Sequence, residues 1–227
     1  MKYKAILLDA DETLFDFRAA EREALTKLMK AYGVECSDTD LQAYDAFNTQ
    51  LWSRFEKGEL DKPEIFRSRF QFMLDRFGLI GDPMHMNQQY LTGIADCSKL
   101  FDGAELFVKK LSETYTLAIV TNGAEYAQKR RFASSLIRQY IPYLFVSEEM
   151  GAAKPDIRYF DAVFRAMDIS DKSSVLIIGD SLSSDIQGGI NAGIDTCWYN
   201  PQRKVNKSGL CPTMEIASYE ELYAYLI

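Results

Sequence analysis

The sequence predicts an α/β protein in which a parallel sheet carries an all-helical insert. Three short apolar segments, each ending at a polar residue, indicate strands covered on both faces, because their apolar residues do not alternate with polar ones. They are residues 3–8, 117–120 and 175–178. Helical patterns at residues 158–167 and 186–192 place helices between and after these strands. Alternation of strands and helices is typical of a parallel sheet.

Residues 17–100 follow a different pattern, in which helical periodicities replace the strand-like segments. Apolar residues at the spacing of one helix face recur in two stretches, Leu25, Leu28, Met29 and Tyr32, and Phe66, Phe70, Met73 and Phe77. Turn-forming residues divide this insert into about four helices, at breaks near 33–38, 58–63 and 78–83. We therefore expect a core domain of residues 1–16 and 101–227 and a helical domain of residues 17–100.

The balance of charge and the scarcity of histidine exclude several classes of function. The chain has 227 residues, with 26 Lys or Arg against 33 Asp or Glu, which gives a net charge of −7. This charge argues against binding to a nucleic acid polymer or an anionic membrane surface. No segment reaches the roughly 20 apolar residues of a membrane span. Because His85 is the single histidine, neither a histidine-dependent triad nor a multi-histidine metal site is expected.

The cysteines and the first residues predict a cytoplasmic protein. Cys36, Cys97, Cys197 and Cys211 form no CxxC pair, and a chain of this length buries a core without disulfides, so we expect reduced thiols. The first apolar run is interrupted by Asp9 before it reaches the length of a signal-peptide core.

Two aspartates, Asp9 and Asp11, follow the first predicted strand. Because side chains alternate along extended backbone, residues at i and i+2 point to the same side. Such a pair suits a divided task, in which one carboxylate attacks as a nucleophile and the other protonates a leaving group. Taken alone, however, acidic residues after a strand more often cap the next helix or lie in solvent.

Further polar groups follow the other two predicted strands. Asp180 and Asp185 come after the third, and oxygen ligands from two strand ends suit Mg²⁺, although Asp185 could instead cap the helix that follows. Thr121 and Asn122 come after the second, where a hydroxyl and backbone N–H groups can receive a phosphate. Lys154 adds a positive charge to the same crevice, beyond the carboxyl ends of the strands.

In order and spacing, these residues resemble the four motifs of the haloacid dehalogenase-like (HAD) hydrolases. The matching residues are Asp9-Ala10-Asp11-Glu12-Thr13, Thr121, Lys154, and Gly179-Asp180 with Asp185, and the match covers essentially the whole chain. The resemblance implies a Rossmann-like core and, because the helical insert lies between the first two motifs, a cap of the C1 type. The chain departs from the family at Glu12, where glycine is commoner.

The resemblance also implies roles for the acidic residues. Asp9 would be the nucleophile that becomes aspartyl-phosphate, and Asp11 the acid that protonates the leaving oxygen and then activates water. Asp9, the backbone carbonyl of Asp11, and Asp180 would hold Mg²⁺, with Asp185 as a further ligand or close beside it.

The remaining motif residues would bind the phosphate. Thr121 and Lys154 would hold the phosphoryl oxygens, and Asn122 would contribute mainly through its backbone. Within the family, an acid at position 11 favours a phosphatase or a phosphomutase over a dehalogenase.

The chain as a whole looks similar to the small pyrimidine-nucleotide 5′-nucleotidases of this superfamily. The stretches that carry this similarity are residues 9–15, 48–52, 69–70, 147–151 and 188–193. We therefore expect a Mg²⁺-dependent phosphatase of nucleoside 5′-monophosphates, pyrimidine ones favoured, that acts as a monomer or homodimer. Trp52 would stack on the base, and Asn48 or Arg69 would bind the base or sugar, unless these residues are structural, as helix core or solvated salt bridges.

Three alternatives stay open. The substrate is another small phosphomonoester, such as a sugar phosphate or a phosphoglycolate-like acid; the enzyme is a phosphomutase; or the chain is a non-catalytic HAD-like binding scaffold. The core motifs do not separate the first alternative from the nucleotidase, because specificity resides in the cap.

Overall fold

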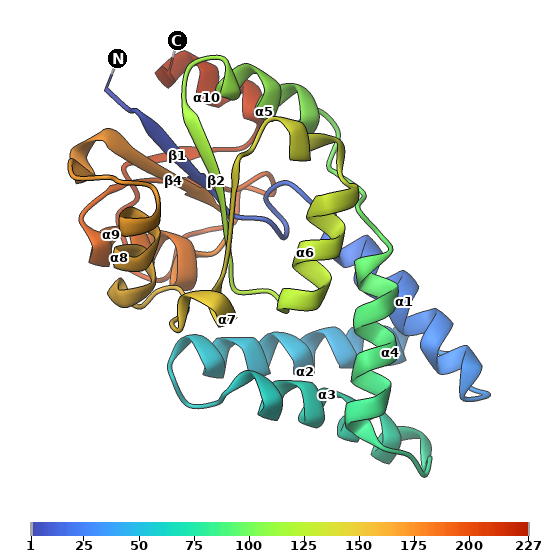
Figure 1. Ribbon diagram of the computed structural model, residues 1–227. Helices are drawn as coiled ribbons and strands as arrows, with labels where there is room; N and C mark the ends of the chain where they lie inside the picture. Colours follow the sequence, from blue (N-terminus) through green and yellow to red (C-terminus); the bar gives the residue numbers. More distant parts are fainter. Residues whose placement is uncertain (1, 227) are drawn as a thin grey trace. The chain divides into compact units, whose positions relative to one another are not determined.

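Six strands of the computed structural model, which describes residues 2–226, form one sheet in the order β3-β2-β1-β4-β5-β6 (Figure 1). Each neighbouring pair is parallel. The strands are β1 (Ala5–Leu8), β2 (Thr116–Thr121), β3 (Tyr143–Val146), β4 (Val175–Gly179), β5 (Asp195–Tyr199) and β6 (Met214–Ile216). The predicted α/β class with a parallel sheet is confirmed, and β3, β5 and β6 join the three strands that the sequence indicated.

The structure divides into two units. The sheet unit comprises Met1–Phe17 and Ser98–Ile227, and the helical unit comprises Arg18–Cys97. The helical insert contains α1 (Phe17–Ala31), α2 (Asp38–Glu56), α3 (Lys62–Phe77) and α4 (Pro83–Ala95). The sheet unit contains α5 (Ala104–Ser112), α6 (Glu125–Ser134), α7 (Ser147–Met150), α8 (Ile157–Ala166), α9 (Gln187–Ala192) and α10 (Tyr219–Leu226). Short helical turns lie at η1 (Leu136–Gln139), η2 (Lys172–Ser174) and η3 (Leu182–Ile186), of which η3 is a π-helical turn.

Both faces of the sheet are covered by helices. In β1, Ile6 and Leu8 pack on one face with residues of α5 and α10, whereas Ala5 and Leu7 pack on the other with residues of α8. All four side chains are buried. This arrangement explains why β1 reads as an unbroken apolar run, since neither face meets water.

The strand order brings the ends of β1, β2 and β4 together. Leu8 is in register with Ile119 of β2 and with Ile178 of β4. The residues that follow these strands therefore leave the sheet at the same edge. The chain builds the sheet outward in opposite directions from β1, with β2 and β3 on one side and β4, β5 and β6 on the other. Open α/β sheets bind ligands in the crevice at such a point.

The helices of the insert begin and end at the residues that the sequence indicated as breaks. Ser37 and Asp61 each form a capping box, with Asp40 and Glu64 respectively, so α2 and α3 have satisfied N-termini. Gly78 ends α3 in the left-handed conformation, at φ 59°. Among residues 2–226, no helix combines the length and the apolar character needed to cross a membrane.

Candidate active site

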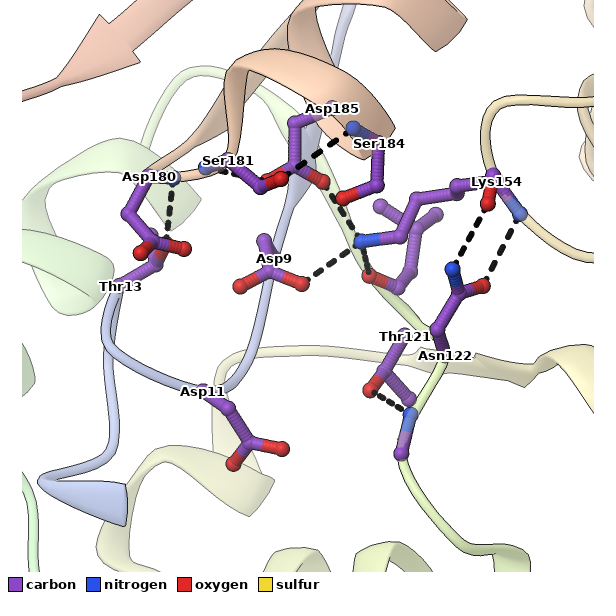
Figure 2. A network of polar contacts seen from close by, with 12 residues as sticks. Asp9, Asp11, Thr13, Thr121, Asn122, Lys154, Asp180, Ser181, Ser184 and Asp185 are labelled. Carbon is purple, nitrogen blue, oxygen red and sulfur yellow. Dashed lines mark hydrogen bonds and ion pairs between the residues drawn. The ribbon is translucent and has the colours of Figure 1, made fainter. Parts of the chain in front are cut away.

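Three carboxylates meet where β1 and β4 end (Figure 2). Asp9 follows β1, Asp180 follows β4, and Asp185 lies in the π-helical turn η3. One oxygen from each lies within 4.8 Å of the others. Asp9 and Asp185 are buried, so their like charges repel each other with little screening by water. Such a cluster requires positive charge.

Lys154 supplies part of that charge. Its Nζ donates hydrogen bonds to Asp9 Oδ1 at 2.6 Å, to Asp185 Oδ1 at 2.6 Å and to the carbonyl oxygen of Val120 at 2.8 Å. The side chain is 1% exposed, and its three N–H bonds match these three acceptors. Lys154 thus holds the nucleophile candidate in place; its predicted contact with a phosphate stays a prediction.

The charges in the cluster shift one another's protonation. Burial raises the pKa of Asp9 to about 7; Lys154 opposes this shift, and Asp185 adds to it. Burial, Asp9 and Asp185 together raise the pKa of Asp180 well above its usual range. Burial lowers the pKa of Lys154, but the carboxylates of Asp185 and Asp9 raise it by more, so the net shift is upward. Lys154 therefore stays protonated, and a second cation would allow all three carboxylates to be ionised.

The donor set fits a hard divalent cation. Carboxylate oxygens that converge from two strand ends are ligands that Mg²⁺ accepts, and Mg²⁺ usually keeps water and substrate oxygens in its remaining positions. Of the three, Asp185 is the least available to a metal ion, because both of its oxygens already accept hydrogen bonds. Oδ1 accepts one from Lys154, and Oδ2 accepts one from the backbone N–H of Ser181 at 3.1 Å. Asp9 and Asp180 are therefore the stronger candidates for direct ligands, with Asp185 beside them.

Asp185 does not cap the helix that follows, as the alternative interpretation held. That helix, α9, has no side-chain cap, and Ser181 caps the preceding turn η3 by accepting a hydrogen bond from the N–H of Ser184 at 3.2 Å. A Cβ atom at Gly179 would lie 2.2 Å from Asp185 Oδ2. Glycine at this position is thus required for the carboxylate to lie against the end of β4.

Two side chains to which the sequence assigned no role, those of Thr13 and Trp198, hold the backbone of Asp180 in place. Thr13 Oγ1 accepts a hydrogen bond from its N–H at 3.1 Å, and Trp198 Nε1 donates to its carbonyl oxygen at 2.9 Å. Thr13 is itself held by Tyr219, whose hydroxyl donates to the Thr13 carbonyl oxygen at 2.7 Å. Thr13 lies in the first motif, but no local signal marks Trp198 or Tyr219, whose contacts depend on the folded chain.

Asn122 orients Lys154 with its side chain. Its Nδ2 donates to the Lys154 carbonyl oxygen at 2.8 Å, and its Oδ1 accepts from the Lys154 N–H at 2.9 Å. The role expected from sequence was mainly through the backbone of Asn122. Beside it, Thr121 is buried, and its Oγ1 accepts a hydrogen bond from the N–H of Gly123 at 3.0 Å.

The side chain of Asp11 lies apart from the three clustered carboxylates (Figure 2). It contacts α6, through Gln128 and Arg131. The metal contact expected of Asp11 is through its backbone carbonyl, and it stays a prediction. Next along the chain, Glu12 has a φ of 60°, the left-handed region that favours glycine. This conformation accounts for the residue type that the family prefers at that position.

The substrate-contact candidates Asn48 and Arg69 lie inside the helical unit. Asn48 Nδ2 donates to Glu21 Oε1 at 2.9 Å, and Arg69 Nε donates to Asn87 Oδ1 at 3.0 Å. Arg69 is 2% exposed, so the interpretation of it as a solvated salt bridge is wrong. Trp52 is half-buried and packs edge-on against Phe55, with ring centroids 5.6 Å apart. Substrate contacts by these three residues remain predictions.

Glu21 should make the stability of the protein depend on pH. Burial raises the pKa of its carboxyl to about 7; the hydrogen bond from Tyr90 and the charge of Arg69 oppose the shift, and Asp45 adds to it. The folded protein therefore holds this proton up to a higher pH than the unfolded chain does. The contribution of Glu21 to the free energy of unfolding is therefore fully present below about pH 4.5, and it is lost as the pH rises to about 7.

Glu21→Gln, which stays neutral, should remove this dependence. Relative to the wild type, the variant should gain on the order of 2–3 kcal/mol in free energy of unfolding between pH 5 and pH 8. Urea unfolding at a series of pH values measures the difference. Glu35→Gln, at an exposed glutamate of the same unit, serves as the control. Parallel curves for Glu21→Gln and the wild type would contradict the prediction.

The chain belongs to the haloacid dehalogenase-like hydrolase family. The model of that family matches residues 6–199, which include all four motifs. The sheet order, with acidic side chains after β1 and β4, places those motifs at one edge. The family identified from the sequence is thereby confirmed, and the chain is an enzyme of the hydrolase class.

The similar proteins include pyrimidine 5′-nucleotidases. The pyrimidine 5′-nucleotidase PynA of Streptococcus pneumoniae is 38% identical over 98% of this chain and 94% of its own length. The pyrimidine 5′-nucleotidase YjjG of Escherichia coli is 33% identical over 98% and 97%. A solved structure of the HAD-hydrolase YfnB from Bacillus subtilis, described as bound to magnesium, is 37% identical, with a TM-score of 0.94 over 100% of this chain and 99% of that one.

Proposed function

We propose that the chain is a Mg²⁺-dependent phosphatase that hydrolyses nucleoside 5′-monophosphates, pyrimidine ones favoured, in the cytoplasm. The observation that carries the proposal is the cluster of Asp9, Asp180 and Asp185, in which Lys154 forms ion pairs with the buried Asp9 and Asp185. This group combines a carboxylate nucleophile with a site for a hard cation, as phosphoryl transfer requires. The similarity to two pyrimidine 5′-nucleotidases supports the substrate class.

In the proposed reaction, a carboxylate oxygen of Asp9 attacks the phosphorus, and the bond from phosphorus to the 5′ oxygen breaks. Asp11 gives its proton to that oxygen, so the nucleoside leaves as an alcohol. Asp11 then takes a proton from a water molecule, whose oxygen attacks the same phosphorus and releases Asp9. The proton that Asp11 gives in the first step is thus returned to it in the second.

The other motif residues would position the phosphate. Asp9, Asp180 and the backbone carbonyl of Asp11 would hold Mg²⁺, which when bound supplies positive charge beside the phosphoryl oxygens. Thr121 Oγ1 accepts the Gly123 N–H, which leaves the hydroxyl hydrogen to donate to a phosphoryl oxygen. Lys154 would keep the carboxylate of Asp9 oriented through the 2.6 Å hydrogen bond that it donates to Oδ1.

Recognition of the nucleoside is assigned to the helical unit, which we propose to be the cap. Trp52 is half-buried, so part of its ring is accessible for stacking on a base. Asn48 and Arg69 are bonded to neighbours within the unit, so any contact with the base or sugar would be made from a rigid position.

A phosphate-release assay tests the proposal. Purified protein with Mg²⁺ should release phosphate from UMP and dTMP at least about tenfold faster than from AMP, ribose 5-phosphate or phosphoglycolate, a difference of about 1.4 kcal/mol in transition-state binding. EDTA should abolish the activity, and excess Mg²⁺ should restore it. Preference for a sugar phosphate would favour the first alternative, and absence of release from every ester would favour a binding scaffold. Full activity in EDTA would refute the metal-assisted mechanism.

A further inference from the structure

Both carboxylate oxygens of Asp11 are bound by side chains of α6. Arg131 Nη1 donates to Oδ1 at 2.5 Å, and Gln128 Nε2 donates to Oδ2 at 2.5 Å. Gln128 and Arg131 are three residues apart on the helix, so they lie on the same face. Neither residue is among the motif residues identified from the sequence.

Both side chains are buried, and each lies close to residues other than Asp11. Arg131 is fully buried, and its guanidinium lies over the ring of Phe15 at 4.5 Å from the centroid. Gln128 is 3% exposed, and a Cβ atom at Gly123 would lie 2.0 Å from its Nε2. Gly123, which follows Thr121 and Asn122 after β2, therefore leaves the space that the Gln128 amide needs to reach Asp11. Ordering two buried polar side chains toward one carboxylate is costly unless that contact is made.

The chemistry of the two contacts differs. Arginine is always a donor and always charged, so Arg131 places a fixed positive charge against Oδ1 of Asp11. Glutamine carries both a donor and an acceptor, so Gln128 can contact Asp11 whether or not the carboxyl is protonated. When Asp11 gives a proton to the leaving oxygen, negative charge develops on its carboxylate, next to the fixed charge of Arg131. A pre-oriented charge of this kind lowers the energy of the transition state.

We propose that Gln128 and Arg131 are positioning residues for proton transfer by Asp11, an inference that rests on the proposed function. Gln128 fixes the direction of the carboxyl, and Arg131 stabilises the carboxylate that forms as the nucleoside leaves. The second step returns the proton from water to Asp11, so the same charge is present during water activation.

Dependence on the leaving group separates this role from a structural one. A nucleoside alkoxide needs a proton to depart, whereas p-nitrophenolate departs without one. The ratio kcat/KM reports the steps up to departure. Gln128→Met and Arg131→Met should therefore lower kcat/KM for UMP by about 10–100-fold, within the range of acid catalysis, and for p-nitrophenyl phosphate by no more than about threefold.

Controls make the test decisive. Arg130→Met, at the exposed neighbour on α6, should leave kcat/KM unchanged for UMP and for p-nitrophenyl phosphate. Circular dichroism shows whether Arg131→Met folds; if it does not, Gln128→Met and Arg131→Lys test the proposal in its place. Arg131→Lys keeps the positive charge, so its kcat/KM for UMP should be within about fivefold of the wild type. Equal losses on both esters would overturn the positioning role while leaving the proposed function intact. A wild type that hydrolyses neither ester would refute the proposed function, and this inference with it.

Discussion

Replacing Asp9 with asparagine should abolish phosphate release, with a loss of at least about 10⁴-fold in kcat. The neutral amide cannot attack phosphorus, and no other carboxylate occupies the same position after β1. The side chain should still fit, because the asparagine Oδ1 can accept the hydrogen bond that Lys154 donates to Asp9.

Phosphate release from UMP with Mg²⁺, measured together with thermal unfolding, checks this prediction. Asp161→Asn is the matched control, since Asp161 lies on the surface in a 3.5 Å ion pair with Lys172. The control should keep wild-type activity. An Asp9→Asn protein that turns over at the wild-type rate would rule out the covalent aspartate.

Lys154→Met should both inactivate and destabilise the protein. Removing the ammonium group leaves Asp9 and Asp185 buried without their shared partner. Breaking a buried ion pair by deleting one member typically costs about 3–5 kcal/mol of unfolding free energy. Asparagine in place of Asp185 in the same protein should recover part of that loss, because it removes one of the two uncompensated charges, but should not restore turnover.

Urea unfolding of the single and double variants measures the effect. Lys172→Met is the control, because exposed ion pairs contribute about 0–1 kcal/mol. Unfolding free energies of Lys154→Met and the wild type that agree within about 1 kcal/mol would show that Lys154 does not balance the cluster.

The sequence indicated β1, β2 and β4 because burial on both faces leaves an uninterrupted apolar run. It did not indicate β5 and β6, for a physical reason. β5 begins with Asp195 and Thr196, and β6 is three residues long with a glutamate in the middle. Their strand conformation comes from pairing with a neighbour already in the sheet, which no local pattern records. β3, an apolar segment of four residues at the edge of the sheet, was also not indicated.

The residues of the site likewise divide into those that the sequence indicated and those that it did not. Asp9, Asp180 and Asp185 could be selected in advance because each follows a strand, and parallel strands end at one edge. Their catalytic and metal-binding roles stay predictions. Arg131 and Gln128 could not be selected in the same way, because they lie within α6 and do not follow a strand. Helical spacing places the two on one face, but only the packed structure shows what that face meets.

The position of β1 in the sheet has a consequence for synthesis on the ribosome. β1 is made first, yet both of its neighbours, β2 and β4, are encoded after the helical insert. The four helices of the insert are contiguous in the chain and can form from local contacts as they emerge. The apolar first strand meanwhile has no partner strand, so Asp9, which follows it, acquires its surroundings only when the last third of the polypeptide has been translated.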